Sequence, residues 1–166
     1  HQGRHVCLAA NEDTLTLVDV TDPAAPFQIS RTGYEGGSYT HQGWLSEDQK
    51  YFFLDDEADE ITFHHNARTY VWDVSDLERP FVAGVHEAAV TAIDHNQFVV
   101  GDHVFQANYT SGLRILRMGD LARGELREVG FFDTHPESDL PEFDGLWGVY
   151  PFFASGIVIV SDISRG

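Results

Sequence analysis

The residues best suited to chemistry are a run of acidic side chains in the middle of the chain. Five of the six residues from 55 to 60 are carboxylates, namely Asp55, Asp56, Glu57, Asp59 and Glu60. Such crowded hard oxygens suit Ca²⁺, which takes about six to eight oxygen ligands in flexible geometry. The D-x-D-x-D-G spacing of an EF-hand loop is absent. We interpret the stretch as a candidate Ca²⁺ site, and a solvated acidic loop is the alternative.

Two histidines form a second candidate set. His41 and His95 lie 95 − 41 = 54 residues apart in similar contexts, Thr-His-Gln and Asp-His-Asn. If this spacing marks a repeat, each histidine begins the first strand of its unit. In a propeller that strand lines the central channel. We therefore expect both rings at the channel mouth with Asp94 beside them, and Trp147 at the corresponding place of the next unit. Such a set suits a metal ion or a small polar ligand. Alternatively, the rings bond neighbouring backbone and join the units.

Nucleophilic catalysis finds no support in the sequence. No G-x-S-x-G nucleophile elbow occurs. The pair Gly36-Gly37 precedes an expected strand rather than a helix, so it does not form a phosphate-binding loop. We therefore assign no catalytic residue.

The elements that position these residues repeat along the chain. The segment 69–80, TYVWDVSDLERP, recurs as LTLVDVTDPAAP at 15–26 and in weaker form as LRILRMGDLARG at 113–124. The second aspartates, Asp22, Asp76 and Asp120, are 54 and 44 residues apart. A strand and turn recurring at about 40–50 residues is typical of a propeller. These aspartates, with Asp19 and Asp73, are expected to cap backbone N–H groups in the turns.

The strand pattern predicts an all-β fold. Short alternating segments bounded by turns suggest four-stranded antiparallel blades, of which roughly three and a half are present as a partial propeller. We expect the end of one blade at 1–38, blades at 39–90 and 91–137, and the start of another at 138–166. Val18, Val71 and Ile115 should be buried in these strands, and Cys7 should be a buried core thiol. The expected strands are 5–10, 15–20, 27–31, 40–45, 51–54, 69–74, 81–85, 93–100, 103–109, 113–118, 126–132, 146–153 and 157–160.

The charge narrows the range of partners. The net charge is −17, from 27 acidic and 10 basic residues, which repels nucleic acid and anionic lipid surfaces. It suits an extracellular protein, a salty environment or cation binding. No apolar run is long enough to span a membrane. The chain reads as a fragment, so the expected partners are the remaining blades of the same protein or another polypeptide that covers its open edges.

Several longer motifs resemble the choice-of-anchor B family, whose members carry LVIVD-type repeats. These motifs are NEDTLTLVDV at 11–20, YTHQGWL at 39–45, DDE at 55–57, RTYVWDVSDL at 68–77, DHN at 94–96, QANY at 106–109 and YPFFASG at 150–156. The resemblance implies a β-propeller on an exported protein, extracellular or at the cell surface. It implies no particular biochemical activity.

Two functions follow as hypotheses. The first is an extracellular or cell-surface binding or scaffold module. The second is a propeller enzyme, similar to a metal-dependent hydrolase, that uses His41, Asp94 and His95 at the channel mouth. Convergence of these side chains separates the two, because an enzyme must bring acid and base groups within hydrogen-bond reach whereas a scaffold has no such need.

Overall fold

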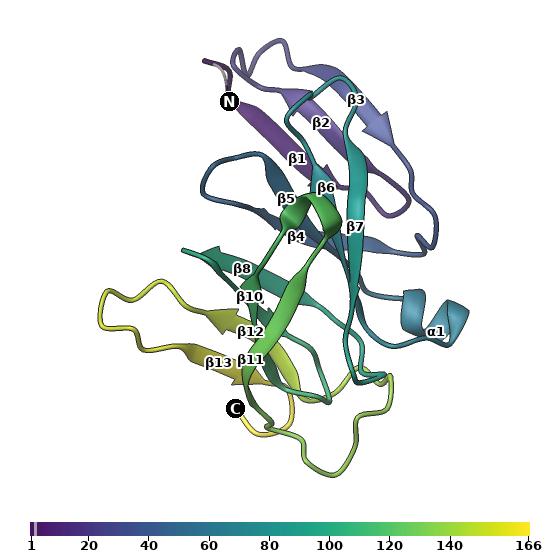
Figure 1. The fold of residues 1–166 in the computed structure, drawn as a ribbon, viewed down its shortest axis with the longest axis vertical. Helices are drawn as coiled ribbons and strands as arrows, with labels where there is room; N and C mark the ends of the chain where they lie inside the picture. The colour runs from purple at the N-terminus through teal and green to yellow at the C-terminus, as the bar shows by residue number, and fades with distance from the viewer. Residues whose placement is uncertain (2) are drawn as a thin grey trace.

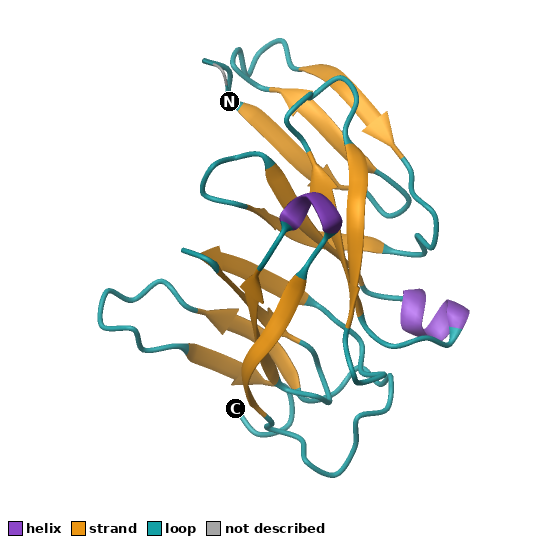
Figure 2. Ribbon diagram, viewed as in Figure 1, coloured by secondary structure: helices purple, strands orange, loops and turns teal. Residues whose placement is uncertain are grey.

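The computed structural model describes residue 1 and residues 3–166, and this part of the chain is built almost entirely of antiparallel β-sheet (Figures 1 and 2). It contains one three-stranded sheet, two four-stranded sheets and one two-stranded sheet, each in simple sequence order. Their strands are β1 (Val6–Ala10), β2 (Leu15–Asp19) and β3 (Phe27–Thr32); β4 (Thr40–Leu45), β5 (Tyr51–Asp56), β6 (Arg68–Asp73) and β7 (Phe81–Glu87); β8 (Asn96–Val100), β9 (His103–Ala107), β10 (Leu113–Met118) and β11 (Leu126–Phe132); β12 (Leu146–Tyr150) and β13 (Ile159–Asp162).

The first strands of successive sheets lie next to one another. β1 contacts β4, β4 contacts β8, and β8 contacts β12. The sheets therefore follow one another from the N-terminal sheet at the top of Figure 1 to the C-terminal sheet at the bottom. The expected all-β fold with four-stranded antiparallel units is confirmed.

The core lies between the faces of neighbouring sheets. In β5, Phe52 and Leu54 pack toward Leu15 and Leu17 of the first sheet, whereas Phe53 packs against Val104 of the third. Successive side chains of a strand point to opposite faces. A strand between two sheets must therefore be apolar on both faces, which explains the uninterrupted segment Tyr-Phe-Phe-Leu at 51–54.

The expected burial of three repeat-strand residues is confirmed for one of them. Val71, in the second sheet, is fully buried between its neighbours. Val18 is half-buried because it points away from the core face that carries Leu15 and Leu17. Ile115 is also half-buried, because the sheet that packs over it has only two strands in the described part of the chain.

The repeated aspartates cap turns, as predicted. The Oδ1 atoms of Asp22, Asp76 and Asp120 each accept a hydrogen bond from the backbone N–H two residues later, at 3.0, 3.1 and 3.2 Å. Asp19 and Asp73 accept equivalent bonds at 2.9 Å. These carboxylates accept from backbone N–H groups that have no backbone acceptor within the turn.

Two further sequence predictions are wrong. The acidic stretch is not a solvated loop, because β5 extends through Asp56 and Asp59–Phe63 forms the short helix α1. The remaining helix is the 3₁₀ turn η1 (Leu121–Arg123). Cys7 is exposed rather than buried in the core. Its neighbours Val6 and Leu8 face the core, so alternation along β1 turns the thiol outward. Within the described residues, no helix is long and apolar enough to cross a membrane.

A close approach between the two four-stranded sheets depends on a glycine in β7. A Cβ atom at Gly84 would lie 2.5 Å from the Arg123 carbonyl oxygen and 2.7 Å from the Gly124 Cα atom. Gly130 lies at the corresponding place in β11, where a Cβ atom would meet only the Ile115 side chain, at 3.8 Å.

We predict that Gly84→Ala lowers the free energy of unfolding by about 1–3 kcal/mol, because backbone atoms would have to move apart. The matched control Gly130→Ala should change it by less than about 0.5 kcal/mol. Urea unfolding followed by circular dichroism measures both changes. Equal effects of the two substitutions would contradict the proposed packing.

Candidate functional site

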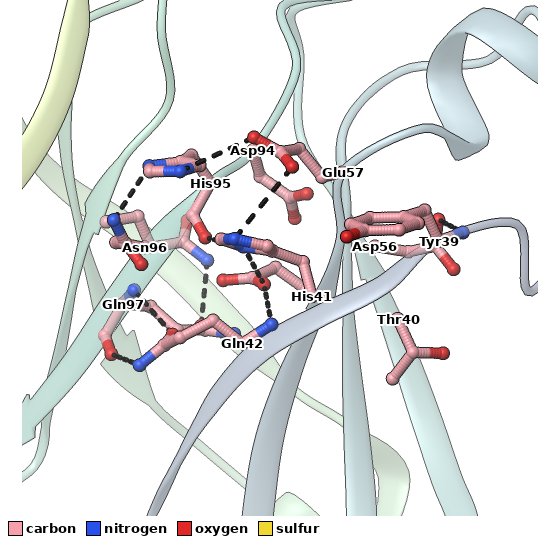
Figure 3. Close-up of polar contacts among 12 residues, drawn as sticks. Tyr39, Thr40, His41, Gln42, Asp56, Glu57, Asp94, His95, Asn96 and Gln97 are labelled. Atoms are coloured by element: carbon pink, nitrogen blue, oxygen red, sulfur yellow. Dashed lines mark hydrogen bonds and ion pairs between the residues drawn. The ribbon is translucent and has the colours of Figure 1, made fainter. Parts of the chain in front are cut away.

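The structure brings His41 and His95 together. Their rings stack with centroids 4.6 Å apart and planes inclined by 23°. His41 lies in β4 and His95 immediately precedes β8, and the contact between these strands of neighbouring sheets places the rings at the same end (Figure 3). The expected juxtaposition of the two histidines is therefore present.

Each ring also bonds the backbone of the next sheet. His41 Nδ1 lies 2.8 Å from the His95 carbonyl oxygen, and His95 Nδ1 lies 2.6 Å from the Trp147 carbonyl oxygen. A carbonyl only accepts, so both Nδ1 atoms carry the hydrogen. The Asn96 amide nitrogen lies 2.7 Å from His95 Nδ1 and donates to the same Trp147 carbonyl oxygen at 3.0 Å. In its neutral form, each ring therefore has an unprotonated Nε2 atom.

Glu57 faces these Nε2 atoms. Its Oε2 lies 3.8 Å from His41 Nε2, and its Oε1 lies 3.4 Å from His95 Nε2. The Tyr109 hydroxyl donates to Oε1 at 2.5 Å. Figure 3 shows Glu57 directed at both imidazoles. One ligand atom from each of His41, Glu57 and His95 lies within 4.8 Å of the others, and we call these three residues the axial cluster.

The two histidines of the cluster differ in pKa. Burial disfavours a charged His41 ring, but the carboxylates of Asp55 and Glu57 outweigh it and raise the pKa of His41 to about 9. Burial lowers the pKa of His95, and a charged His41 lowers it further. The ring of His41 therefore takes up a proton more readily than the ring of His95. The His41 Nε2 and Glu57 Oε2 atoms, 3.8 Å apart, are too distant for a hydrogen bond.

Four further carboxylates lie behind the cluster with almost no exposure. Asp55, Asp59, Glu60 and Asp94 are each at most 1% exposed. Each has at least one oxygen without a hydrogen-bond partner among the described residues, and Asp94 has two. Desolvation raises the pKa of Asp55 to about 7, of Asp59 to about 6 and of Glu60 to about 9, and raises that of Asp94 well above its ordinary value.

The five carboxylates of the acidic stretch do not form one set of ligands. Asp56 accepts hydrogen bonds from the Ser38 and Tyr39 N–H groups and from the Tyr34 hydroxyl, at 2.6–2.7 Å, so it is occupied structurally. Asp55 accepts from the Gln42 N–H, whereas Asp59 and Glu60 begin α1. Of the five, only Glu57 lies near the Nε2 atoms of both histidines. Asp55 Oδ1 lies 3.6 Å from Nδ1 of His41 alone.

The other two predicted site residues are neighbours of His95, Trp147 in space and Asp94 in the chain. The Trp147 ring is 53% exposed, and its centroid is 5.2 Å from that of His95. Asp94 is buried, and its N–H donates to Glu60 Oε1 at 3.3 Å. Trp147 therefore borders the open side of the axial cluster, and Asp94 belongs to the buried carboxylates.

Sequence reasoning missed the contact of Glu57 with the histidines and the role of Tyr109. The signal for Glu57 was the β4–β5 hairpin, whose register pairs Leu45 with Phe52 and Thr40 with Asp56. Counting back along that hairpin brings residue 57 to the start of β4. Tyr109 has a left-handed backbone, with φ of 36°, which is uncommon outside glycine and which a sequence pattern does not reveal.

Comparisons with known proteins show the fold. No protein-family model and no curated protein matches this chain. A periplasmic gluconolactonase of Pseudomonas aeruginosa aligns with a TM-score of 0.66 and 14% identity over 98% of this chain and 48% of its own. A protein of Lactobacillus plantarum aligns with a TM-score of 0.66 and 15% identity over 95% of this chain and 52% of its own. The chain is a partial β-propeller. It spans about half the length of these solved structures.

The buried carboxylates predict how stability depends on pH. Below the ordinary Glu60 pKa of 4.5, the carboxyl is protonated in both the folded and unfolded states. Between 4.5 and about 9 only the folded state keeps the proton, so the stability of the fold decreases as the pH rises through this window.

We predict that Glu60→Gln, which mimics the protonated acid, stabilises the protein at pH 8 by on the order of 2 kcal/mol and has little effect at pH 4.5. Urea unfolding in the presence of a chelator, at both pH values, measures the difference. The exposed carboxyl of Glu142 supplies the control, and Glu142→Gln should change stability little at either pH. A Glu60→Gln effect independent of pH would contradict the prediction.

Proposed function

We propose that this partial propeller belongs to an extracellular or cell-surface protein of the choice-of-anchor B type and serves there as a binding module. The repeat motifs that resemble this family support the proposal, as does the net charge of −17, which suits an acidic, exported surface. We further propose that the ligand binds at the axial cluster, beside Trp147.

The observation that carries this proposal is the convergence of side chains from three sheets. His41 comes from β4, His95 precedes β8, and Trp147 lies in β12. Glu57, immediately after β5, gives the group a negative charge. Small-ligand sites combine a few convergent polar groups with an aromatic surface. A ligand with a cationic or polar group against Glu57 and a flat face against Trp147 fits this arrangement.

Further polypeptide is also part of the proposal. Phe131 and Phe132 in β11 and Ile157 before β13 are each more than 60% exposed. Large apolar side chains in such numbers favour contact with another surface. We propose that remaining blades of the same protein, or another polypeptide, cover them.

A second candidate function is hydrolysis. It is favoured by the same contacts, because a carboxylate lies 3.4–3.8 Å from two imidazoles and also bonds a tyrosine hydroxyl. Such groups can exchange protons with a substrate. The gluconolactonase similarity, at 14% identity, concerns the fold alone. It makes a sugar lactone a sensible first compound to assay, with Glu57→Gln as the variant that should lose activity.

We predict that wild-type protein binds at least one compound from a panel of small amines, amino acids and sugars, measured by calorimetry with and without a chelator. Trp147→Ala should weaken that binding about tenfold or more, because stacking on the exposed ring is lost. Tyr150→Ala removes another exposed aromatic of β12 and is the control that should bind as wild type does. Absence of binding, or equal binding by all three proteins, would contradict a ligand site beside Trp147.

A further inference from the structure

We propose that the axial cluster binds one divalent transition-metal ion of the Zn²⁺ class through His41 Nε2, His95 Nε2 and a carboxylate oxygen of Glu57. This inference rests on the proposed binding site and names its inorganic occupant. It differs from the Ca²⁺ site expected of the acidic stretch both in its residues and in its ligand chemistry.

The hydrogen bonds of the two rings prepare them as ligands. Both Nδ1–H groups donate to backbone carbonyls, of His95 and of Trp147, at 2.8 and 2.6 Å. Metal-binding histidines commonly donate their second ring nitrogen in this way, which fixes the tautomer and the ring orientation. The Nε2 lone pair of each ring is therefore held toward Glu57.

The separations suit a small ion. In tetrahedral geometry with metal–ligand distances of about 2.0–2.1 Å, neighbouring ligand atoms lie about 3.3 Å apart. His95 Nε2 and Glu57 Oε1 are 3.4 Å apart. His41 Nε2 lies 3.8 Å from the other oxygen of the same carboxylate, Oε2. All three ligand atoms already lie within 4.8 Å of one another.

The electrostatics also favour a cation between these atoms. When both rings are neutral, their Nε2 atoms and the carboxylate oxygen are all acceptors, so they repel one another unless a proton or a cation lies between them. Among the described residues, no lysine or arginine forms an ion pair with Glu57 or with the buried carboxylates behind it. A divalent ion would supply the missing positive charge.

The donor set selects the kind of metal. Two imidazole nitrogens and one carboxylate suit Zn²⁺ and its transition-metal neighbours, whereas Ca²⁺ and Mg²⁺ prefer oxygen ligands. The Tyr109 hydroxyl, 2.5 Å from Glu57 Oε1, holds the carboxylate in place as a positioning residue. Three protein ligands leave a fourth position free for water or for a donor atom of the organic ligand beside Trp147.

Metal binding is tested on chelator-treated, dialysed protein by calorimetry with Zn²⁺, Co²⁺ and Ca²⁺ separately. We expect one equivalent of Zn²⁺ to bind, no comparable Ca²⁺ binding, and a visible Co²⁺ spectrum typical of tetrahedral nitrogen and oxygen ligation. Glu57→Gln keeps the side-chain shape and should weaken Zn²⁺ binding more than tenfold, and His95→Ala should abolish it. His103→Ala removes a half-exposed histidine of β9 outside the cluster and should bind as wild type does.

A measurement on unaltered protein guards against variants that fail to fold. Anomalous diffraction from wild-type crystals soaked in Zn²⁺ should place the ion between the two Nε2 atoms and Glu57. An ion found elsewhere, the absence of Zn²⁺ binding, or full Zn²⁺ binding by folded Glu57→Gln would each overturn the proposal. The two failures are distinguishable. Organic compounds that bind beside Trp147 in chelator would preserve the proposed function without the metal, whereas metal binding without any organic ligand would leave the metal site alone.

Discussion

The bonds that side chains make across neighbouring sheets determine most of what this structure can do. Propeller sheets pack face to face, so the backbone ladders lie within each sheet. Among the described residues, backbone bonds between sheets are confined to isolated bridges such as Glu12 with Thr40. Here β4 and β8 are joined instead by side chains. The Gln42 amide donates to the Gln97 carbonyl at 3.0 Å and accepts from the Gln97 N–H at 2.9 Å. In the same interface, the His41 ring donates to the His95 carbonyl oxygen.

These bonds connect architecture to chemistry. A histidine that donates through Nδ1 to a carbonyl has its ring orientation and tautomer fixed by the sheet packing. The expectation that the rings join the units is therefore confirmed together with the expected convergence of the histidines. Because one nitrogen of each ring serves packing, the other remains free, and the same two residues can perform both tasks.

The buried carboxylates behind them carry a cost in stability that hydrogen bonding only partly offsets. Such a cost is typical of sites kept for function.

Much of the fold was accessible from the sequence, for identifiable reasons. The β-branched and aromatic residues of the segments Tyr-Val-Trp-Asp-Val and Leu-Thr-Leu-Val-Asp predict strands. The aspartates that follow predict the turns. The corresponding positions of His41 and His95 could be inferred from the 54-residue spacing. What could not be read was the direction of individual side chains. The β4–β5 pairing contains an irregularity between Thr40 and Gln42, and such a shift changes which acidic residue faces the histidines.

Differences between the repeats explain why the second and third sheets, as far as the structure describes them, contribute different residues to the axial cluster. β5 begins at residue 51 and β9 at residue 103, so residues 55–57 and 107–109 are equivalent, 52 positions apart. The second sheet has Asp55, Asp56 and Glu57 there, whereas the third has an alanine, an asparagine and a tyrosine. Tyr109 thus occupies, in its own sheet, the position equivalent to Glu57. Its hydroxyl donates a hydrogen bond to Glu57 of the neighbouring sheet. The two sheets share a backbone geometry, so residues 57 and 109 occupy equivalent positions. Because their sequences differ there, the second sheet provides the carboxylate and the third provides the hydroxyl that orients it. A perfectly regular propeller would repeat the same acid in every sheet, and the mutual repulsion of those carboxylates would destabilise the channel. The departure from symmetry is therefore what permits a buried acid at this position.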